Sequence, residues 1–347
     1  MKGRVIVLDR INGREAAALV VDGQLVDILI DAPEGYPLAP ESIVRGRLGQ
    51  PMKGQGGFSV DLPSGKGFLR QTKGLTPGRT TLLQVSGCAE RGKAPPVALR
   101  RLHKGRTVIV TPGAPGVNLS RAIKDPETRQ KLQAAVEACL PAEDGPGIIV
   151  RSAAVHAELD DAVEEVRMLL EENARIGADT DGGPELLLDA PGSHHIAWRE
   201  WSLPVPDDVI EGEGAFDSFD LYSALSDLTQ PRIGLKQGAH AFVEPTRALV
   251  AVDVNTGADR SLSAGLSANL ALAEALPGQL RLRGLGGQIV LDMAPMAKKE
   301  RRRVEDALRH AVRRDGSDIV LAGWTPLGHF ELQRKRDRWP LTELWTQ

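Results

Sequence analysis

The sequence predicts a multi-domain protein of mixed α/β and β class. It has 347 residues, of which 41% are hydrophobic and 26% charged, so it can bury two or more cores and is too apolar to be disordered. The first hundred residues contain short β-like runs broken by Gly and Pro. From about residue 215 onward, strand-like and helix-like segments alternate, which is typical of a sheet covered by helices.

Residues 2–30 contain three short runs of alternating apolar and polar residues, separated by Asn12-Gly13 and Asp22-Gly23. Asn-Gly and Asp-Gly favour tight hairpin turns, so this segment predicts a three-stranded meander. Residues 31–104 are rich in Gly and Pro and contain β-like pieces such as GFSVDL and TTLLQVSG. This pattern favours a small Greek-key barrel of the OB-fold type.

Residues 105–157 predict a compact α+β unit, with strands at RTVIVTP and GPGIIVR on either side of a helix at ETRQKLQAAVEACL. Apolar residues at helical spacing predict an amphipathic helix over 159–176. The Gly-rich segment 178–195 is expected to be a loop-rich connection between domains. Beyond it we expect helices at FDSFDLYSAL, SANLALAEAL and AKKERRRVEDALRHAVRR, and strands at HAFVEP, ALVAVDVN, GGQIVLDM and SDIVLAG.

The charge is divided unevenly along the chain. Residues 41–121 hold 14 Lys/Arg and 3 Asp/Glu, whereas residues 122–220 hold 7 and 23. A basic module of this kind predicts a polyanionic partner, although some of its charges are expected to be only a solvated surface. The two cysteines form no CxxC pair, and charged residues interrupt every apolar run near the N-terminus, so we expect reduced thiols, no membrane partner and a cytoplasmic location.

Two aspartates stand at the ends of predicted strands. In ALVAVDVNTG, the period of a strand places Asp253 and Asn255 on one face, and Asp292 ends the strand QIVLD. Ligands of α/β sheets bind at the carboxyl ends of the strands, and two carboxylates are sufficient for Mg²⁺. Either aspartate alone would more often cap a turn or a helix, but the basic run at 298–303 favours the metal interpretation.

Three segments, which include the two strands with aspartates, resemble motifs of a known family. The segments ALVAVDVNTG, SANLALAEALPGQLRLRGLGGQIVLDMAPM and GHFELQRKR are similar to the catalytic core of the ribonuclease E/G family. That family carries a DxN strand, an RLR-x-x-GG turn, a strand that ends in Asp and an E-x-x-R-x-R segment. VNLSRAIKD and IIVRSA extend the resemblance upstream, and it is weakest over 178–215.

The resemblance implies a domain order and a metal site. It implies that Asp253 and Asp292 ligate Mg²⁺, that Asn255 orients the site, and that all three are catalytic. The implied domains are an RNase H-like subdomain (1–36 and 178–248), an OB-fold (37–104), a 5′-end sensor (105–177) and a DNase I-like catalytic subdomain (249–347).

The resemblance also implies contacts with RNA. Phe58 and Phe68 match aromatic residues of the OB-fold that stack on bases, and Lys93 matches a basic residue there. Arg121 is also expected to bind RNA. Without the resemblance, two phenylalanines in a small barrel would more often be core residues. Lys93 lies within the basic module described above.

Four residues match the family's pocket for a 5′-monophosphate, namely Gly105, Ile109, Arg151 and Ser152. A guanidinium can bind a phosphate through two hydrogen bonds, and a hydroxyl adds one more. The alternative is that Arg151 pairs with one of the many carboxylates in 122–220.

The expected function is therefore Mg²⁺-dependent internal cleavage of single-stranded RNA, with 5′-monophosphate sensing, to give 5′-phosphate and 3′-hydroxyl ends. The resemblance implies a role in ribosomal RNA maturation or messenger RNA decay.

No CPxC zinc link is present, so a zinc-linked tetramer is not expected. Pro326 stands where the family has an arginine, and Arg247 where it has an acidic residue. Contacts with the substrate near the metal are therefore expected to differ from those of the family. Alternatives are a non-catalytic RNA-binding protein and a metal-dependent phosphatase, but no P-loop is present.

Overall fold

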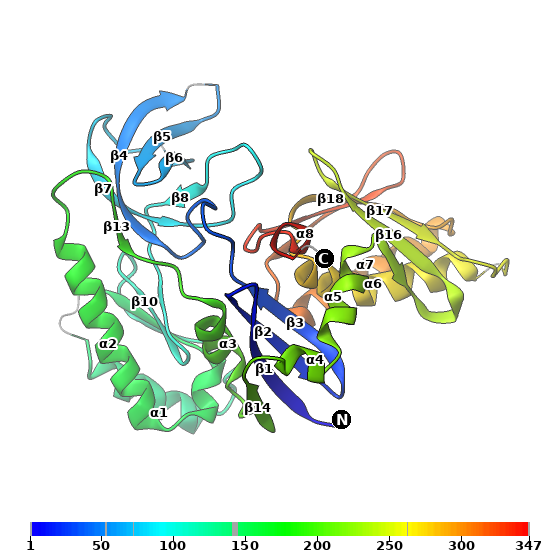
Figure 1. The fold of residues 1–347 in the computed structure, drawn as a ribbon, viewed down its shortest axis with the longest axis horizontal. Helices are drawn as coiled ribbons and strands as arrows, with labels where there is room; N and C mark the ends of the chain where they lie inside the picture. Colours follow the sequence, from blue (N-terminus) through cyan, green and yellow to red (C-terminus); the bar gives the residue numbers. More distant parts are fainter. Residues whose placement is uncertain (1, 53, 72, 141–144, 262, 346–347) are drawn as a thin grey trace. The chain divides into compact units, whose positions relative to one another are not determined.

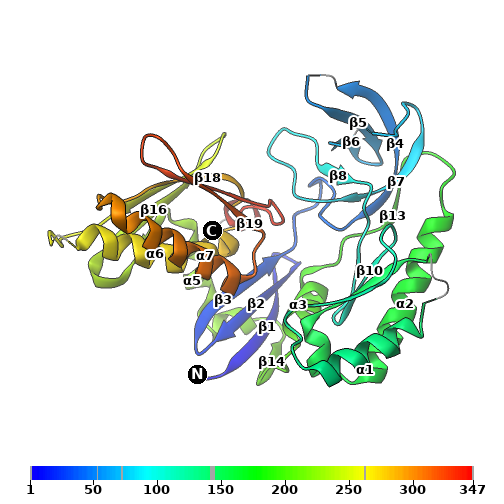
Figure 2. The ribbon, with the colours of Figure 1, turned by 180° about the vertical axis from the view of Figure 1, so that it is seen from behind.

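The computed structural model describes residues 2–52, 54–71, 73–140, 145–261 and 263–345. The chain forms two compact units (Figures 1 and 2). The first unit contains residues 1–22 and 29–211, and the second contains residues 23–28 and 212–347. The chain is thus multi-domain and of mixed class, as the sequence predicts.

The N-terminal meander is present as predicted. Its strands are β1 (Arg4–Ile11), β2 (Arg14–Val21) and β3 (Gln24–Ile30). Asn12 and Asp22 adopt the left-handed conformation, with φ values of 51° and 50°, as tight Asn-Gly and Asp-Gly turns require. A distant strand, β14 (Asp208–Glu211), pairs in parallel with β1, so the sheet order is β14-β1-β2-β3. Helix α3 (Ser193–Trp201) contacts β2.

The Gly- and Pro-rich segment forms a closed five-stranded barrel, which confirms the predicted OB-like module. Pairing of the first strand with the fourth in sequence closes it, and β13 (Glu185–Leu188) pairs with the start of the first strand. Alternate side chains point inward and form one apolar core that includes Val44, Leu48, Val60 and Leu83. The barrel strands are β4 (Ile43–Met52), β5 (Gly57–Leu62), β6 (Gly65–Leu69), β7 (Thr80–Val85) and β8 (Pro96–Ala98).

The third sheet has the order β11-β12-β10-β9. Helix α1 (Pro126–Glu137) is capped by Asp125, whose carboxylate accepts a hydrogen bond from the Thr128 amide at 2.8 Å. Helix α2 (Leu159–Ala178) buries its apolar side against this sheet, and it follows a short 3-10 helix, η1 (Ser152–His156). The strands are β9 (His103–Lys104), β10 (Val108–Thr111), β11 (Val117–Leu119) and β12 (Gly147–Val150).

The second unit is built on a six-stranded sheet of order β15-β16-β17-β18-β20-β19. Helices α6 (Ala264–Leu282) and α7 (Arg301–Asp315) pack on one face of it and share its apolar core (Figure 1). The strands are β15 (Arg232–Gly234), β16 (His240–Pro245), β17 (Val250–Asn255), β18 (Gly287–Asp292), β19 (Ile319–Trp324) and β20 (Phe330–Arg334). The remaining helices are α4 (Ala215–Ser218), α5 (Leu221–Thr229), η2 (Lys236–Gly238), η3 (Lys298–Glu300) and α8 (Leu341–Leu344).

The structure differs from the sequence prediction in several places. The expected loop at 178–195 contains β13 and the start of α3. The sheet that carries the aspartates already begins at Arg232, because β15 and β16 pair with β17; the sequence prediction grouped them with 178–248. Helix α6 continues past Pro277, because Leu276 and Leu280 are buried on either side of it, and packing overrides the low helix propensity of proline.

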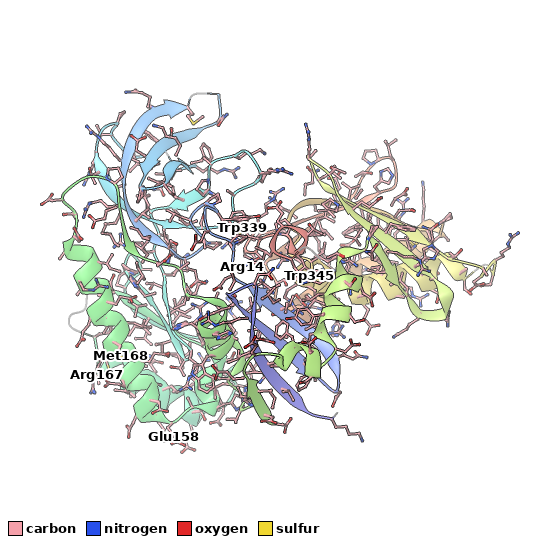
Figure 3. All side chains as sticks on the ribbon, viewed as in Figure 1. Arg14, Glu158, Arg167, Met168, Trp339 and Trp345 are labelled. Carbon is pink, nitrogen blue, oxygen red and sulfur yellow. The ribbon has the colours of Figure 1, made fainter. Side chains whose placement is uncertain are left out.

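The end of the described chain is also packed into the second unit. Trp339 and Trp345 (Figure 3) are each only 8% exposed. The Trp339 carbonyl lies so close to Gly284 that a β-carbon there would be 1.9 Å from its oxygen. None of the helices in the described ranges has both the length and the apolar character needed to cross a bilayer.

Candidate functional site

The two predicted metal ligands lie side by side. Strands β17 and β18 are parallel neighbours, and Asp253 is the register partner of Asp292. Both side chains are exposed on the sheet face opposite the helices. The amide of Asn255 donates a hydrogen bond to Asp253 Oδ2 at 2.8 Å. The structure thus brings together all three residues that the sequence assigns to catalysis.

The alternation of the strands produces this arrangement. Val252, Val254 and Leu291 point into the core and are nearly inaccessible, so their neighbours Asp253 and Asp292 must point outward. Burial of these apolar side chains fixes the register, because a slip of one residue would put both aspartates in the core.

A buried asparagine holds the chain that follows Asp292. Asn269 of α6 is fully buried, and its amide group accepts a hydrogen bond from the Ala294 amide and donates one to the Ala294 carbonyl, both at 2.9 Å. Close by, Gly265 lets α6 approach this loop, since a β-carbon there would lie 2.0 Å from the Pro295 carbonyl oxygen. These contacts position the loop directly after Asp292.

His329 is a neighbour of the site that the sequence did not reveal. Its Nε2 atom lies 3.6 Å from Asp292 Oδ1. The residue precedes β20, whose Phe330 is the register partner of Leu291. No local motif marks this histidine, because only the pairing of β18 with β20 brings it to Asp292.

The donor set fits a hard divalent cation. Two exposed carboxylates and an amide offer only oxygen ligands, and Mg²⁺ needs one or two protein carboxylates, with water and phosphate completing its shell. Among the described residues, no group of three or more His, Cys, Asp or Glu is arranged to hold a metal. The basic run follows in η3 and α7, where Arg301 stacks on Trp324 at 4.6 Å and Lys298, Lys299 and Arg302 are exposed.

The barrel separates the two predicted stacking residues. Phe58 is 3% exposed and belongs to the barrel core, so its ring cannot stack on a base, and the core alternative applies. Phe68, which pairs with Ser59, lies on the opposite face of the barrel wall and is half-buried. Lys93 and Arg121 are exposed, and Lys93 forms an ion pair with Glu90 at 2.7 Å.

The four predicted 5′-phosphate ligands lie in one part of the first unit, but the arginine is already paired. Arg151 donates a hydrogen bond to the Gly105 carbonyl at 2.7 Å and forms an ion pair with Glu200. This pairing is the alternative that the sequence left open. Ser152 is exposed at the start of η1, and Ile109 is half-buried in β10.

A second carboxylate lies against the same loop. Glu165 of α2 accepts hydrogen bonds from the amides of Arg106 at 2.6 Å and Thr107 at 2.7 Å. A β-carbon on Gly105 would lie 2.4 Å from the Glu165 carboxyl carbon, so a larger residue there would displace this carboxylate. The Glu165 carboxylate therefore already occupies the backbone amides that could otherwise bind an anion from solution.

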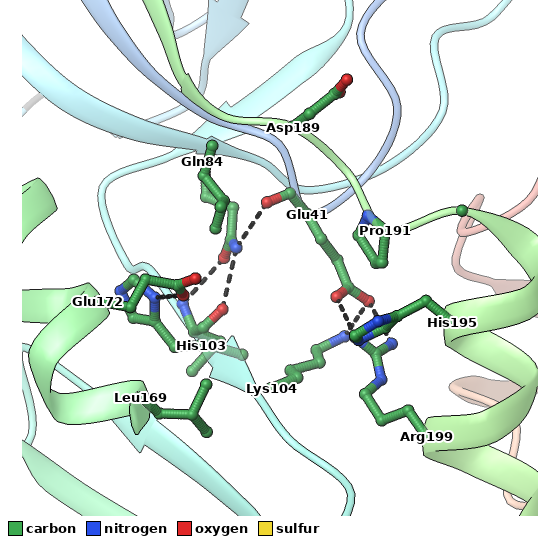
Figure 4. Close-up of a pocket in the computed structure, with 13 residues that line it drawn as sticks. Glu41, Gln84, His103, Lys104, Leu169, Glu172, Asp189, Pro191, His195 and Arg199 are labelled. Carbon is green, nitrogen blue, oxygen red and sulfur yellow. Dashed lines mark hydrogen bonds and ion pairs between the residues drawn. The ribbon is translucent and has the colours of Figure 1, made fainter. Parts of the chain in front are cut away.

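An ion network continues from Arg151 into a cavity of about 300 Å³ (Figure 4). Arg199 binds both Glu200, at 2.8 Å, and Glu41, at 2.7 Å, and Lys104 contacts Glu41 at 2.8 Å. Burial alone would raise the pKa of Glu41, but the hydrogen bonds and charges of Arg199 and Lys104 hold it below its usual value. Glu41 is therefore held in its anionic form by the two cations that it contacts in this cavity.

Comparisons with known proteins point to one family. The family model described as "Ribonuclease E/G family" matches residues 103–210 and 207–337. Ribonuclease E of Synechocystis sp. is 28% identical, over 80% of this chain and 48% of its own length. Ribonuclease G of Escherichia coli K12 is 35% identical, over 35% of this chain and 26% of its own.

Ribonuclease E of Haemophilus influenzae is 27% identical over 76% of this chain, and 32% of its own length is covered. The chain thus spans about half or less of the curated relatives that it matches. The family model nevertheless matches well over half of the 347 residues, across the sheet of β9 to β12 and the sheet that carries Asp253 and Asp292. This chain belongs to the ribonuclease E/G family.

Proposed function

We propose that this chain is a Mg²⁺-dependent endoribonuclease that hydrolyses single-stranded RNA in RNA processing or decay. The observation that carries the proposal is the pairing of Asp253 with Asp292 at the ends of neighbouring parallel strands. Membership of a family whose similar proteins are named ribonuclease E and ribonuclease G supports it.

Asp253 and Asp292 would hold the ion, which would polarise the scissile phosphate as a Lewis acid. Asn255 orients one carboxylate by its hydrogen bond to Asp253. Asn269 fixes the loop that follows Asp292 through its hydrogen bond to the Ala294 carbonyl. Hydrolysis at such a site is expected to leave a 5′-phosphate and a 3′-hydroxyl.

The first unit supports a single-stranded substrate. Residues 41–121 hold an excess of positive charge, 14 Lys/Arg against 3 Asp/Glu, which suits a phosphate backbone. Phe68 on the outer face of the barrel wall, with exposed Lys93 and Arg121, would bind unpaired nucleotides by stacking and charge. Phe58 is left out of this set, because it is a core residue.

A cleavage assay tests the proposal. A fluorescent single-stranded oligoribonucleotide should be cut internally in Mg²⁺, remain intact in EDTA and be cut again when Mg²⁺ is restored. The same sequence annealed to its complement should be resistant. If the intact RNA binds tightly but is not cut in any divalent metal, the chain is instead a non-catalytic RNA-binding protein on the same scaffold.

Sensing of a 5′-monophosphate makes a separate prediction. A phosphate must displace Glu200 from Arg151, since the two are paired. We expect 5′-monophosphorylated RNA to be cut several-fold faster than 5′-hydroxyl RNA. Glu200→Gln should widen this difference, because it leaves the guanidinium without its competing carboxylate.

The matched variant Arg151→Gln should remove the difference and leave basal cleavage intact, because Asp253 and Asp292 are unchanged. Initial rates on the two substrates, measured side by side for the three proteins, decide the question. If the wild type cuts the two substrates at equal rates, and Glu200→Gln does so too, this chain does not sense the 5′ end.

A further inference from the structure

The two aspartates belong to a longer row of side chains that crosses the exposed face of the second unit's sheet. Arg232 of β15 is the register partner of Phe242, Phe242 that of Asp253, and Asp253 that of Asp292. Register partners on neighbouring strands project from the same face, with β-carbons about 5 Å apart. One cation, one aromatic ring and two carboxylates are therefore lined up across four strands.

The aromatic member of this row is held in a defined orientation. The Phe242 ring packs edge to face against His240, with the ring centroids 5.6 Å apart and the planes at 85°. His240 is itself the register partner of Asn255. Both rings are half-buried, whereas the side chains that alternate with them, Ala241 and Val243, are fully buried in the core. Phe242 is therefore not part of the core.

We propose that Phe242, supported by His240, is a stacking platform for the base of the nucleotide next to the scissile phosphate. The proposal rests on the proposed function and names a residue that selects the substrate. Stacking on an aromatic ring is available to every base, so the platform would not select sequence. It would select unpaired nucleotides, because a base within a duplex has no free face.

The neighbours of Phe242 suit a nucleotide better than an apolar ligand. On one side Arg232 is exposed and can pair with a phosphate of the bound strand. On the other side lies Asp253, the proposed ligand of the metal that would bind the scissile phosphate. The order of the row, with a cation, a ring and then the carboxylates, thus suits successive contacts with phosphate, base and phosphate along one strand.

An abasic scan tests this platform. In a series of oligonucleotides with a defined cleavage site, each carries one abasic residue at a different position. We expect wild-type kcat/KM to fall about 5- to 140-fold when the base next to the cleaved bond is absent, the loss expected for one stacking contact.

Phe242→Leu keeps an apolar side chain and removes the ring. This variant should cut the intact oligonucleotide as poorly as the wild type cuts the abasic one, and the abasic residue at that position should cost it nothing more. The matched control is Gln333→Leu, an exposed change on β20 of the same sheet, which should keep the wild-type profile. Melting temperatures of both variants should equal that of the wild type.

Binding measured in EDTA gives a readout that is independent of cleavage. An abasic residue at the same position should weaken RNA binding by the wild type but not by Phe242→Leu. A flat abasic profile for the wild type, or the same penalty in Phe242→Leu as in the wild type, would overturn the platform and leave the nuclease in place. If the wild type cuts no RNA in any metal, the proposed function fails, and the binding scan in EDTA still decides the role of Phe242.

Discussion

Replacing Asp253 or Asp292 by asparagine is expected to abolish RNA cleavage and to leave RNA binding largely unchanged. The two carboxylates are register partners, so each would supply part of the same Mg²⁺ site, and loss of either charge removes much of its affinity. A bound metal contributes several kcal/mol of transition-state stabilisation. The rate should therefore fall by at least about a hundredfold.

Glu244→Gln is the matched control for these variants. Glu244 is an exposed carboxylate on the same sheet face, and its register partner is Ala251, two residues before Asp253. The control should retain cleavage, and calorimetric titration should show loss of metal binding only in the two aspartate variants. Activity within about tenfold of the wild type in either aspartate variant would contradict the assignment.

Asp27→Asn is expected to destabilise the second unit by about 3–5 kcal/mol, the cost of removing one partner from a buried ion pair. Asp27 is 6% exposed. Its carboxylate contacts Arg338 at 2.5 Å and Arg281 at 2.9 Å. An asparagine would leave both guanidinium groups near a neutral amide, although Asp315 still pairs with Arg281 at 2.9 Å.

Urea denaturation combined with hydrogen exchange in peptides from α6 and β20 measures this loss in the second unit. The control is Glu305→Gln, which breaks an exposed pair with Arg309 on α7 and should change the free energy of unfolding by less than about 1 kcal/mol. An equal effect of the two substitutions would show that the Asp27 cluster contributes no more than a surface pair.

The same cluster predicts a dependence on pH. Burial alone would raise the pKa of Asp27, but the charges of Arg338 and Arg281 and the hydrogen bonds to Arg338 and Ile28 bring it below the ordinary value of 3.8. A carboxylate with a lowered pKa in the folded state stabilises that state above its unfolded pKa. The difference between wild type and Asp27→Asn should thus be full at neutral pH and shrink as pH falls below 3.8.

Much of this fold could be predicted from the sequence, because local rules specify it. Asn12-Gly13 and Asp22-Gly23 define two hairpins, and both residues that precede glycine have positive φ. Strict alternation in VAVDVN and QIVLD puts the valines and leucines inside and the aspartates outside. Candidate catalytic residues at strand ends could therefore be named before the pairing of β17 with β18 was known.

The sequence could not show which of two equally reasonable environments a residue would have. Phe58 and Phe68 are separated by ten positions in similar β-like runs, and only the closure of the barrel buries the first and leaves the second half-exposed. Helix α6 likewise continues beyond Pro277, because packing on both sides compensates for the missing backbone hydrogen bond.

The sequence by itself determined the modules, the charged segments and the two aspartates, since turn chemistry and side-chain periodicity act over a few residues. Only the tertiary structure decided that Arg151 pairs with Glu200, that Glu165 caps the amides after Gly105, and that Phe242 and His329 flank the aspartates. These contacts join residues from separate elements. Their partners are selected by strand register and by burial of charge, and neither leaves a mark in the local sequence.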